Sequence, residues 1–111
     1  MEVIGVGDKI TKVRLKGRLD TPSVDQIETR LVATLVPGGK SAIIDLSDVE
    51  FVASMAIRML ISVARSLRQR HARLALYGVT SLVQETFDSV ALSAIIPIGA
   101  DETDALRLVS S

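Results

Sequence analysis

Ser54 is the residue of this sequence with the clearest chemical possibilities. It stands where the spacing of apolar residues becomes that of a helix, so its oxygen could accept a hydrogen bond from an unpaired N–H group of the first turn. A phosphate on this serine would meet the positive end of the same helix. It would also add about −1.5 to −2 charges to a surface that we expect to contain Val52, Met55 and Met59. Ser54 is therefore a candidate for helix capping, for modification, or for both.

Few other residues offer catalytic or metal-binding chemistry. The chain has no cysteine, which excludes disulfides, thiol catalysis and thiolate metal sites. His71 is the only histidine, so it has no second imidazole with which to build a metal site. Pro37-Gly38-Gly39 lacks the lysine–serine pattern of a phosphate-binding loop. We therefore predict no enzymatic activity, no cofactor and no metal.

Arg58 and a basic cluster further along the chain each have a structural and a functional interpretation. Arg58 follows Ser54 by four residues, close enough on a helix to reach a phosphate there, although a solvated arginine is the favoured interpretation. The basic cluster further along suits a helix C-terminus and has no interleaved aromatic residues for base stacking: Arg65, Arg68, Arg70, His71 and Arg73. With a formal net charge of zero, the chain is not expected to bind nucleic acid or an anionic membrane.

Length and composition suit one small domain. The chain has 111 residues, 48% of them hydrophobic, and its aromatic residues are two Phe and one Tyr, so the core must be aliphatic. No apolar run reaches the roughly 18 residues of a membrane span, and no signal peptide is recognisable. We expect a single domain over residues 1–111, located in the cytoplasm.

The patterning predicts strands and helices in alternation. Residues 2–7 and 10–15 read as a hairpin with a turn at Gly7-Asp8, and the chain leaves the second strand at residues 17–20. The other strands are expected at 42–46, ended by Ser47-Asp48, at 73–77, and as an edge strand at 94–98. Helices are expected to begin at Asp20–Pro22, at Ser54, at Thr80-Ser81 and at Asp101–Thr103. This order predicts an α/β fold, with a small mixed sheet of about four to five strands packed against about four helices.

The stretch SAIIDLSDVEFVASMAIRMLISVARSLRQR, from Ser41 to Arg70, resembles the STAS-domain family of anti-sigma-factor antagonists. In that family a buried strand precedes the pattern F-hydrophobic-Asp-Ser-Ser/Thr-Gly-hydrophobic, and the first serine accepts a phosphate. The matching residues here are FVASMAI at 51–57, so the resemblance implies phosphorylation of Ser54. Ala53, Met55 and Ala56 replace the family's aspartate, hydroxyl residue and glycine. The order of elements extends the resemblance across essentially the whole chain.

The resemblance implies the STAS fold and a binding protein without catalysis. Unphosphorylated, it would dock onto an anti-sigma factor that is also a serine-protein kinase. Phosphorylation of Ser54 would end this interaction, and a metal-dependent serine/threonine phosphatase would restore it. The implied partner-binding residues are Asp20, Asp45, Val52, Ala53, Ser54, Met55, Arg58 and Met59. A monomer or weak dimer is expected.

Two alternatives remain open. Some solitary STAS proteins are constitutive subunits of a transporter ATPase, and the alanine at position 53 favours such a role, with Ser54 acting only as a helix cap. Alternatively, Asp20, Asp45 and Ser54 could surround a pocket in an enzyme or small-ligand binder. No acid–base or metal constellation in the sequence supports this last alternative.

Overall fold

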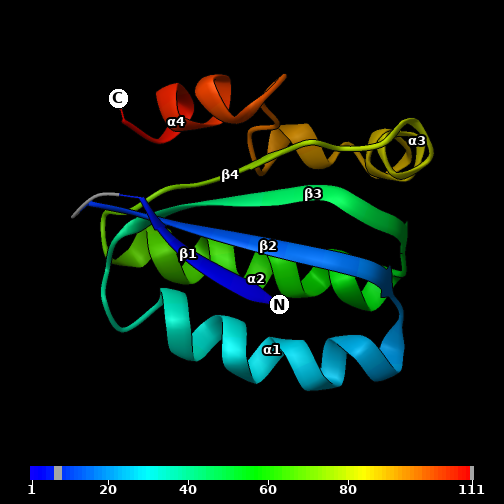
Figure 1. Cartoon of the computed structure of the whole chain (residues 1–111), viewed down its shortest axis with the longest axis horizontal. Helices are drawn as coiled ribbons and strands as arrows, with labels where there is room; N and C mark the ends of the chain where they lie inside the picture. The colour runs from blue at the N-terminus through cyan, green and yellow to red at the C-terminus, as the bar shows by residue number, and fades with distance from the viewer. Residues whose placement is uncertain (7–8, 111) are drawn as a thin grey trace.

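The chain folds as one mixed sheet with helices on both of its faces. A computed structural model describes residues 1–6 and 9–110 (Figure 1). The elements are β1 (Glu2–Val6), β2 (Ile10–Leu19), α1 (Thr21–Leu35), β3 (Ser41–Val52), α2 (Ser54–Gln69), β4 (Leu74–Tyr77), α3 (Ser81–Ser89), a short 3₁₀ helix η1 (Leu92–Ala94) and α4 (Glu102–Ser110). The strands lie in the order β1-β2-β3-β4, with β1 antiparallel to β2 and the other pairs parallel. The predicted α/β fold, a mixed sheet of about four to five strands with about four helices, is confirmed, since the described residues form four strands and four α-helices. The predicted turn at Gly7-Asp8 lies outside the described residues.

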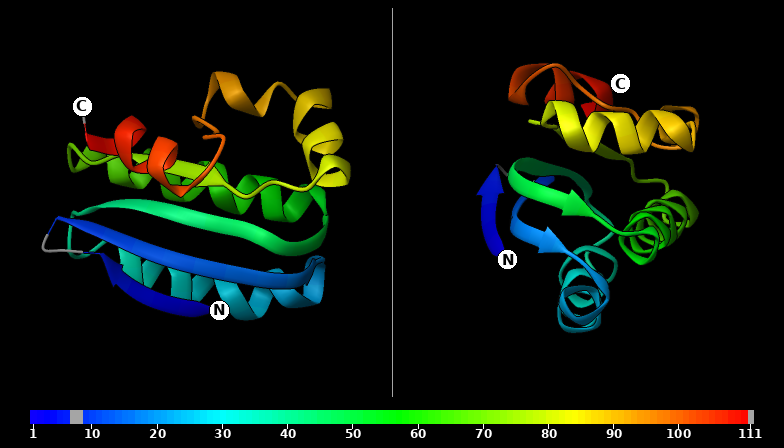
Figure 2. Two further views of the ribbon diagram at one scale, coloured as in Figure 1. Left: turned by 45° about the horizontal axis from the view of Figure 1, so that its top comes forward. Right: turned by 90° about the vertical axis from the view of Figure 1, so that its right-hand side faces the viewer.

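The helices divide between the two faces of the sheet. α1 and α2 lie side by side on one face, and α3 and α4 lie on the other (Figures 1 and 2). Ile44 of β3 belongs to the large core beneath α1 and α2, whereas Ile43 packs with Ala105 and Val109 of α4. Both isoleucines are fully buried, which confirms the prediction that this strand is covered on both faces.

Two strands run further than the sequence predicts. β2 continues to Leu19 and β3 continues through Ser47-Asp48 to Val52. The two extensions pair with each other, because Lys16 lies opposite Asp48 and Leu19 lies opposite Val52. The pairing of β2 with β3 shifts register twice, between Arg14 and Lys16 and again between Gly17 and Arg18. Gly17 has a φ of +80°. The predicted ends at residues 17–20 and at Ser47-Asp48 are therefore wrong.

The predicted strand at 94–98 is also wrong in most of its length. Residues 92–94 form η1, and only Ile98 makes a bridge, to Leu76 of β4. Ala91, in a left-handed conformation with a φ of 52°, turns the chain into η1. Within the described part of the chain, the outer edge of β4 is therefore bridged only at Ile98, and no fifth strand forms beside it.

Charged side chains join α4 to the sheet. Glu102 of α4 pairs with Lys12 of β2 and accepts a hydrogen bond from the Tyr77 hydroxyl of β4 at 3.2 Å. The hydrogen bond from Lys12 holds the pKa of Glu102 below its ordinary value. These contacts position α4 over β2 and β4.

The C-terminus of α2 closes in a Schellman arrangement. The His71 N–H donates to the Arg68 carbonyl at 3.0 Å, and the Ala72 N–H donates to the Leu67 carbonyl at 2.8 Å. His71 adopts a left-handed φ of 62°, a conformation that glycine usually supplies at this position. The turn directs the chain from α2 straight into β4.

Candidate functional site

The carboxyl ends of β2 and β3 lie together and position the candidate residues. The Ala53 N–H, just after β3, donates to the Leu19 carbonyl at the end of β2, at 2.9 Å. Asp20 and Ser54 follow these two residues and begin α1 and α2 at the same edge of the sheet. We define the carboxyl-edge surface as the exposed residues Arg18, Phe51, Ser54 and Met55 together with the half-buried Ala53.

Ser54 is the first helical residue of α2 and not its cap. The N-cap is Ala53, with an extended φ of −84° and ψ of 165°, and it offers no side-chain hydrogen bond to the helix. The predicted capping role of Ser54 is therefore wrong. The reason is the hydrogen bond to Leu19, because it holds Ala53 in register with β2 and lets the helix begin only at the next residue.

The Ser54 hydroxyl is exposed and makes no hydrogen bond to any residue that the structure describes. The first turn of α2 contains no acidic residue, so no carboxylate occupies the positive end of the helix dipole. An anion attached to Ser54 would find the first-turn N–H groups without a competing side-chain acceptor. The position is thus both accessible and electrostatically suited to a phosphate.

The apolar part of the surface differs from the prediction. Met55 is 39% exposed, but Val52 and Met59 are only 4% and 1% exposed. Val52 faces the core from the last position of β3, and Met59 lies on the buried face of α2 beside Leu60. The assignment of Val52 and Met59 to a partner-binding surface is therefore wrong, since both belong to the core.

Phe51 and Arg18 are surface residues that the sequence-based set of site residues omits. Phe51 is 38% exposed, and the Arg18 guanidinium lies over its ring at 4.4 Å from the centroid. The two residues are neighbours because they are paired in the parallel ladder of β2 and β3. The exposed aromatic at the start of the FVASMAI motif is the signal that identifies Phe51, whereas Arg18 becomes evident only from strand register.

Asp20 does have the capping role that its position suggested. Its Oδ1 accepts a hydrogen bond from the Ser23 N–H at 3.2 Å at the start of α1. Hydrogen bonds from the Ser23 side chain and backbone hold the pKa of Asp20 below its ordinary value. One carboxylate oxygen is thus engaged within the fold, at the same sheet edge as Ser54.

Asp45 does not lie near Ser54. In the sheet it is paired with Arg14 of β2 and Tyr77 of β4. Seven residue steps, roughly 23 Å of extended chain, separate it from Val52 at the end of β3. Asp45 is 5% exposed and accepts hydrogen bonds from the Ser47 N–H at 2.9 Å, the Ser47 Oγ at 2.6 Å and the Arg14 Nε at 3.3 Å. Burial disfavours its charge, but the bonds from Ser47 and Arg14 prevail and lower its pKa. Asp45 is a structural carboxylate, so its place among partner-binding residues is wrong.

Arg58 lies on the exposed side of α2. It lines a shallow hollow of about 380 Å³ with Ile61, Ser62, Arg65 and Ser66, and makes no ion pair with any described residue. No hydrogen bond joins it to Ser54 within the described residues, so the solvated interpretation fits the structure.

A second hollow adjoins the carboxyl-edge surface. It has a volume of about 650 Å³ and is lined by Lys16, Gly17, Ser47, Asp48, Val49, Glu50, Thr80 and Leu82. Leu82, at the start of α3, is 63% exposed. This hollow therefore combines the charged side chains of Lys16, Asp48 and Glu50 with the exposed apolar side chain of Leu82.

The described residues contain no group of three or more His, Cys, Asp or Glu side chains placed to hold a metal ion. None of the helices in the described ranges is long and apolar enough to cross a membrane. Within the basic cluster, Arg70 donates a hydrogen bond to the Pro37 carbonyl, after the end of α1, at 2.9 Å.

Comparisons with known proteins concern both the sequence and the fold of this chain. The family model described as STAS domain matches residues 4–105. The protein BtrV of Bordetella bronchiseptica is 27% identical over 84 residues, which cover 76% of this chain and 72% of BtrV. The anti-sigma-B factor antagonist of Listeria monocytogenes is 29% identical over 82 residues, which cover 74% of this chain and 72% of that protein. Among solved structures, the anti-sigma factor antagonist SpoIIAA in its unphosphorylated form has a TM-score of 0.72 at 19% identity, covering 96% of this chain and 94% of SpoIIAA. The phosphorylated form of SpoIIAA from Bacillus has a TM-score of 0.71 at 20% identity, covering 96% of this chain and 97% of SpoIIAA.

Proposed function

Since the chain belongs to the STAS domain family, we propose that it is an anti-sigma factor antagonist whose binding is switched by phosphorylation of Ser54. Unphosphorylated, the carboxyl-edge surface docks onto an anti-sigma factor that is also a serine-protein kinase. The observation that carries the proposal is the exposed Ser54 hydroxyl, which makes no hydrogen bond within the described residues and lies at the start of α2 beside the exposed Met55.

A phosphate at Ser54 would act on both sides of the docking equilibrium. It would add about −1.5 to −2 charges next to the apolar atoms of Met55, where a docked partner would otherwise bury them. It would also be stabilised on the free domain by the N–H groups of the first turn of α2. Because about 1.4 kcal/mol changes affinity tenfold, a difference of a few kcal/mol between the two states suffices for release.

The residues that depart from the family pattern are compatible with this mechanism. Ala56 is completely buried against the core, and alanine favours a helix by about 1 kcal/mol relative to the family's glycine. Ala53 leaves the helix without a side-chain cap, so the first-turn N–H groups remain available to the phosphate. Met55 adds a flexible apolar side chain to the surface, of a kind that adapts to a partner.

The remaining parts of the proposal concern the reaction cycle. The bound kinase transfers a phosphoryl group from ATP to the Ser54 oxygen, and a metal-dependent serine/threonine phosphatase removes it. The antagonist itself catalyses neither step. The cycle takes place in the cytoplasm, and the domain works as a monomer or weak dimer.

A paired capture experiment tests the proposal. Wild type, Ser54→Ala and Ser54→Glu serve as baits in native lysate, with mass spectrometry of the bound proteins and of Ser54 after addition of ATP. Ser62→Glu is the matched control, because Ser62 is an exposed serine further along the same helix. We expect wild type, Ser54→Ala and Ser62→Glu to retain a serine-kinase ATPase that Ser54→Glu loses, and phosphate to appear on Ser54.

Two results would contradict the proposal. Equal capture of the kinase by Ser54→Glu would show that charge at this position does not control docking. Capture of a transporter ATPase equally by all baits would identify a constitutive structural subunit, in which Ser54 has no switching role.

A further inference from the structure

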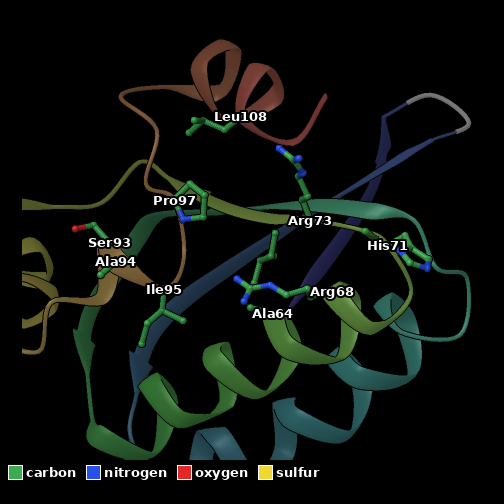
Figure 3. Close-up of a pocket in the computed structure, with 11 residues that line it drawn as sticks. Ala64, Arg68, His71, Arg73, Ser93, Ala94, Ile95, Pro97 and Leu108 are labelled. Carbon is green, nitrogen blue, oxygen red and sulfur yellow. The ribbon is translucent and has the colours of Figure 1, made fainter. Parts of the chain in front are cut away.

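A separate cavity lies at the other end of α2 (Figure 3). Its volume is about 580 Å³, within the roughly 300–1,000 Å³ typical of small-molecule sites. It is lined by Ala64, Arg68, His71, Ala72, Arg73, Leu74, Ser93, Ala94, Ile95, Pro97 and Leu108. Arg68 lies about 20 Å along the helix axis from Ser54, so this cavity is distinct from the carboxyl-edge surface.

The charged residues that line the cavity are all basic, and no carboxylate is among them. Arg68 extends from α2 toward Ile95 (Figure 3) and forms no ion pair with the residues that the structure describes. Arg73 already interacts with another group, so we assign the binding charge to Arg68. The positive potential around the Arg68 guanidinium favours an anion.

The backbone of β4 adds a donor to the same cavity. At Leu76 the N–H donates to the Pro97 carbonyl at 3.0 Å and the carbonyl accepts from the Gly99 N–H at 2.7 Å, so these groups point away from β3. Strand backbones alternate with a period of two, so Leu74 directs its N–H to the same outer edge. Because residues 92–94 form η1, no strand of the described chain pairs with this edge at Leu74.

The end of α2 does not oppose an anion as strongly as a free helix C-terminus would. The carbonyls of Leu67 and Arg68 accept the N–H groups of Ala72 and His71 in the Schellman turn. Those two carbonyl oxygens are therefore hydrogen-bonded within the fold, which partly compensates their negative partial charge.

The rest of the lining is aliphatic. Ile95 is 38% exposed, and Figure 3 shows it with Pro97 and Leu108 around the side of the cavity that faces η1 and α4. The lining contains no Phe, Tyr or Trp side chain on which a nucleobase could stack. The arrangement favours an aliphatic body over a nucleotide.

We propose that this cavity binds a small amphiphilic carboxylate, with its headgroup at Arg68 and the Leu74 N–H and its hydrocarbon chain along Ile95, Pro97 and Leu108. The site is independent of phosphorylation at Ser54 and of the partner that docks there.

The test uses octanoate as the probe and the amide chemical shifts of the ¹⁵N-labelled protein as the measurement. Acetate carries the charge without the chain, and 1-octanol carries the chain without the charge. Arg68→Gln removes the headgroup contact, and Arg65→Gln is the matched control, because Arg65 is an exposed arginine on the same helix that does not line the cavity. Both variants change exposed positions, and their spectra without probe show directly whether the fold is retained.

We expect saturable shifts for octanoate at residues 72–74 and 93–95, and much weaker effects of acetate and octanol. Because Arg68→Gln removes a hydrogen bond to the charged headgroup, it should weaken octanoate binding about tenfold or more, whereas Arg65→Gln should leave the affinity unchanged. Absence of localised, saturable shifts at millimolar octanoate would overturn the proposal. Equal affinity of wild type and Arg68→Gln, or octanol binding as tightly as octanoate, would overturn it as well.

Discussion

Gly78 connects β4 to the loop before α3, and replacing it with alanine should destabilise the domain strongly. Its φ is +70°, and a Cβ placed there would lie 2.8 Å from the Asp45 Oδ1 and 3.1 Å from the Ser47 backbone nitrogen. That Oδ1 accepts both hydrogen bonds from Ser47, at 2.9 and 2.6 Å. The new methyl group would therefore have to displace a buried carboxylate from its donors.

The magnitude follows from two contributions. A left-handed conformation costs alanine about 1–2 kcal/mol, and weakening hydrogen bonds to a charged, buried group costs about 1.5–3 kcal/mol. We expect Gly78→Ala to lower the free energy of unfolding by about 2.5–5 kcal/mol. With a urea m-value of about 2 kcal/mol/M, the unfolding midpoint would fall by about 1.2–2.5 M.

Urea unfolding followed by circular dichroism measures this change. Gly38→Ala is the matched control, because a Cβ there meets no atom within 4 Å, and the expected change is less than about 0.5 kcal/mol. In an Asp45→Ala background, Gly78→Ala should cost only the backbone strain of about 1–2 kcal/mol. A loss below about 1 kcal/mol in the wild-type background, or the same loss in both backgrounds, would refute the role of the carboxylate contact.

Two other predictions test charge and backbone conformation. Because the folded-state pKa of Asp45 lies below the ordinary value of 3.8, its ionised form contributes stability above that pH, and this contribution disappears as the pH falls through the folded-state pKa. The difference in unfolding free energy between wild type and Asp45→Asn, measured by urea titration from pH 7 downward, should therefore shrink only in strongly acidic buffer; a difference independent of pH would contradict this. His71→Gly should raise the free energy of unfolding by about 1 kcal/mol, since glycine adopts the left-handed φ of 62° without strain. Thermal unfolding measures this gain, and a lower melting temperature for the glycine variant would show that the imidazole itself stabilises the turn.

Local sequence patterns correctly predicted the structural features that depend only on residues close together in the chain. The caps of α1 and α3 are Asp20 and Thr80, as their side-chain chemistry indicates. The alternation in β2 predicts the buried Val13 and Leu15, because a strand with one wet face has a period of two. The assignment to the STAS family was also available from the motif around Ser54 and is confirmed by the match over residues 4–105.

The errors have a common physical origin in contacts between distant segments. Ser47-Asp48 looks like a turn, yet the second half of β2 pairs with it and keeps it extended. Ser54 looks like a cap, yet the Leu19 carbonyl fixes Ala53 and displaces the start of the helix by one residue. The burial of Met59 and of Asp45 likewise depends on which face of its element each side chain occupies. Period and composition do not contain these tertiary contacts.

The contact between Tyr77 and Glu102 gives the domain a natural spectroscopic reporter. The chain has one tyrosine and no tryptophan, so near-ultraviolet fluorescence arises essentially from Tyr77. Its ring is 6% exposed and its hydroxyl donates to Glu102 of α4. Detachment of α4 from the sheet would expose the ring to water and remove its carboxylate acceptor, and both changes alter the emission. The movement of this helix can therefore be followed in the unlabelled protein, during unfolding or on binding a partner that lacks tryptophan and tyrosine.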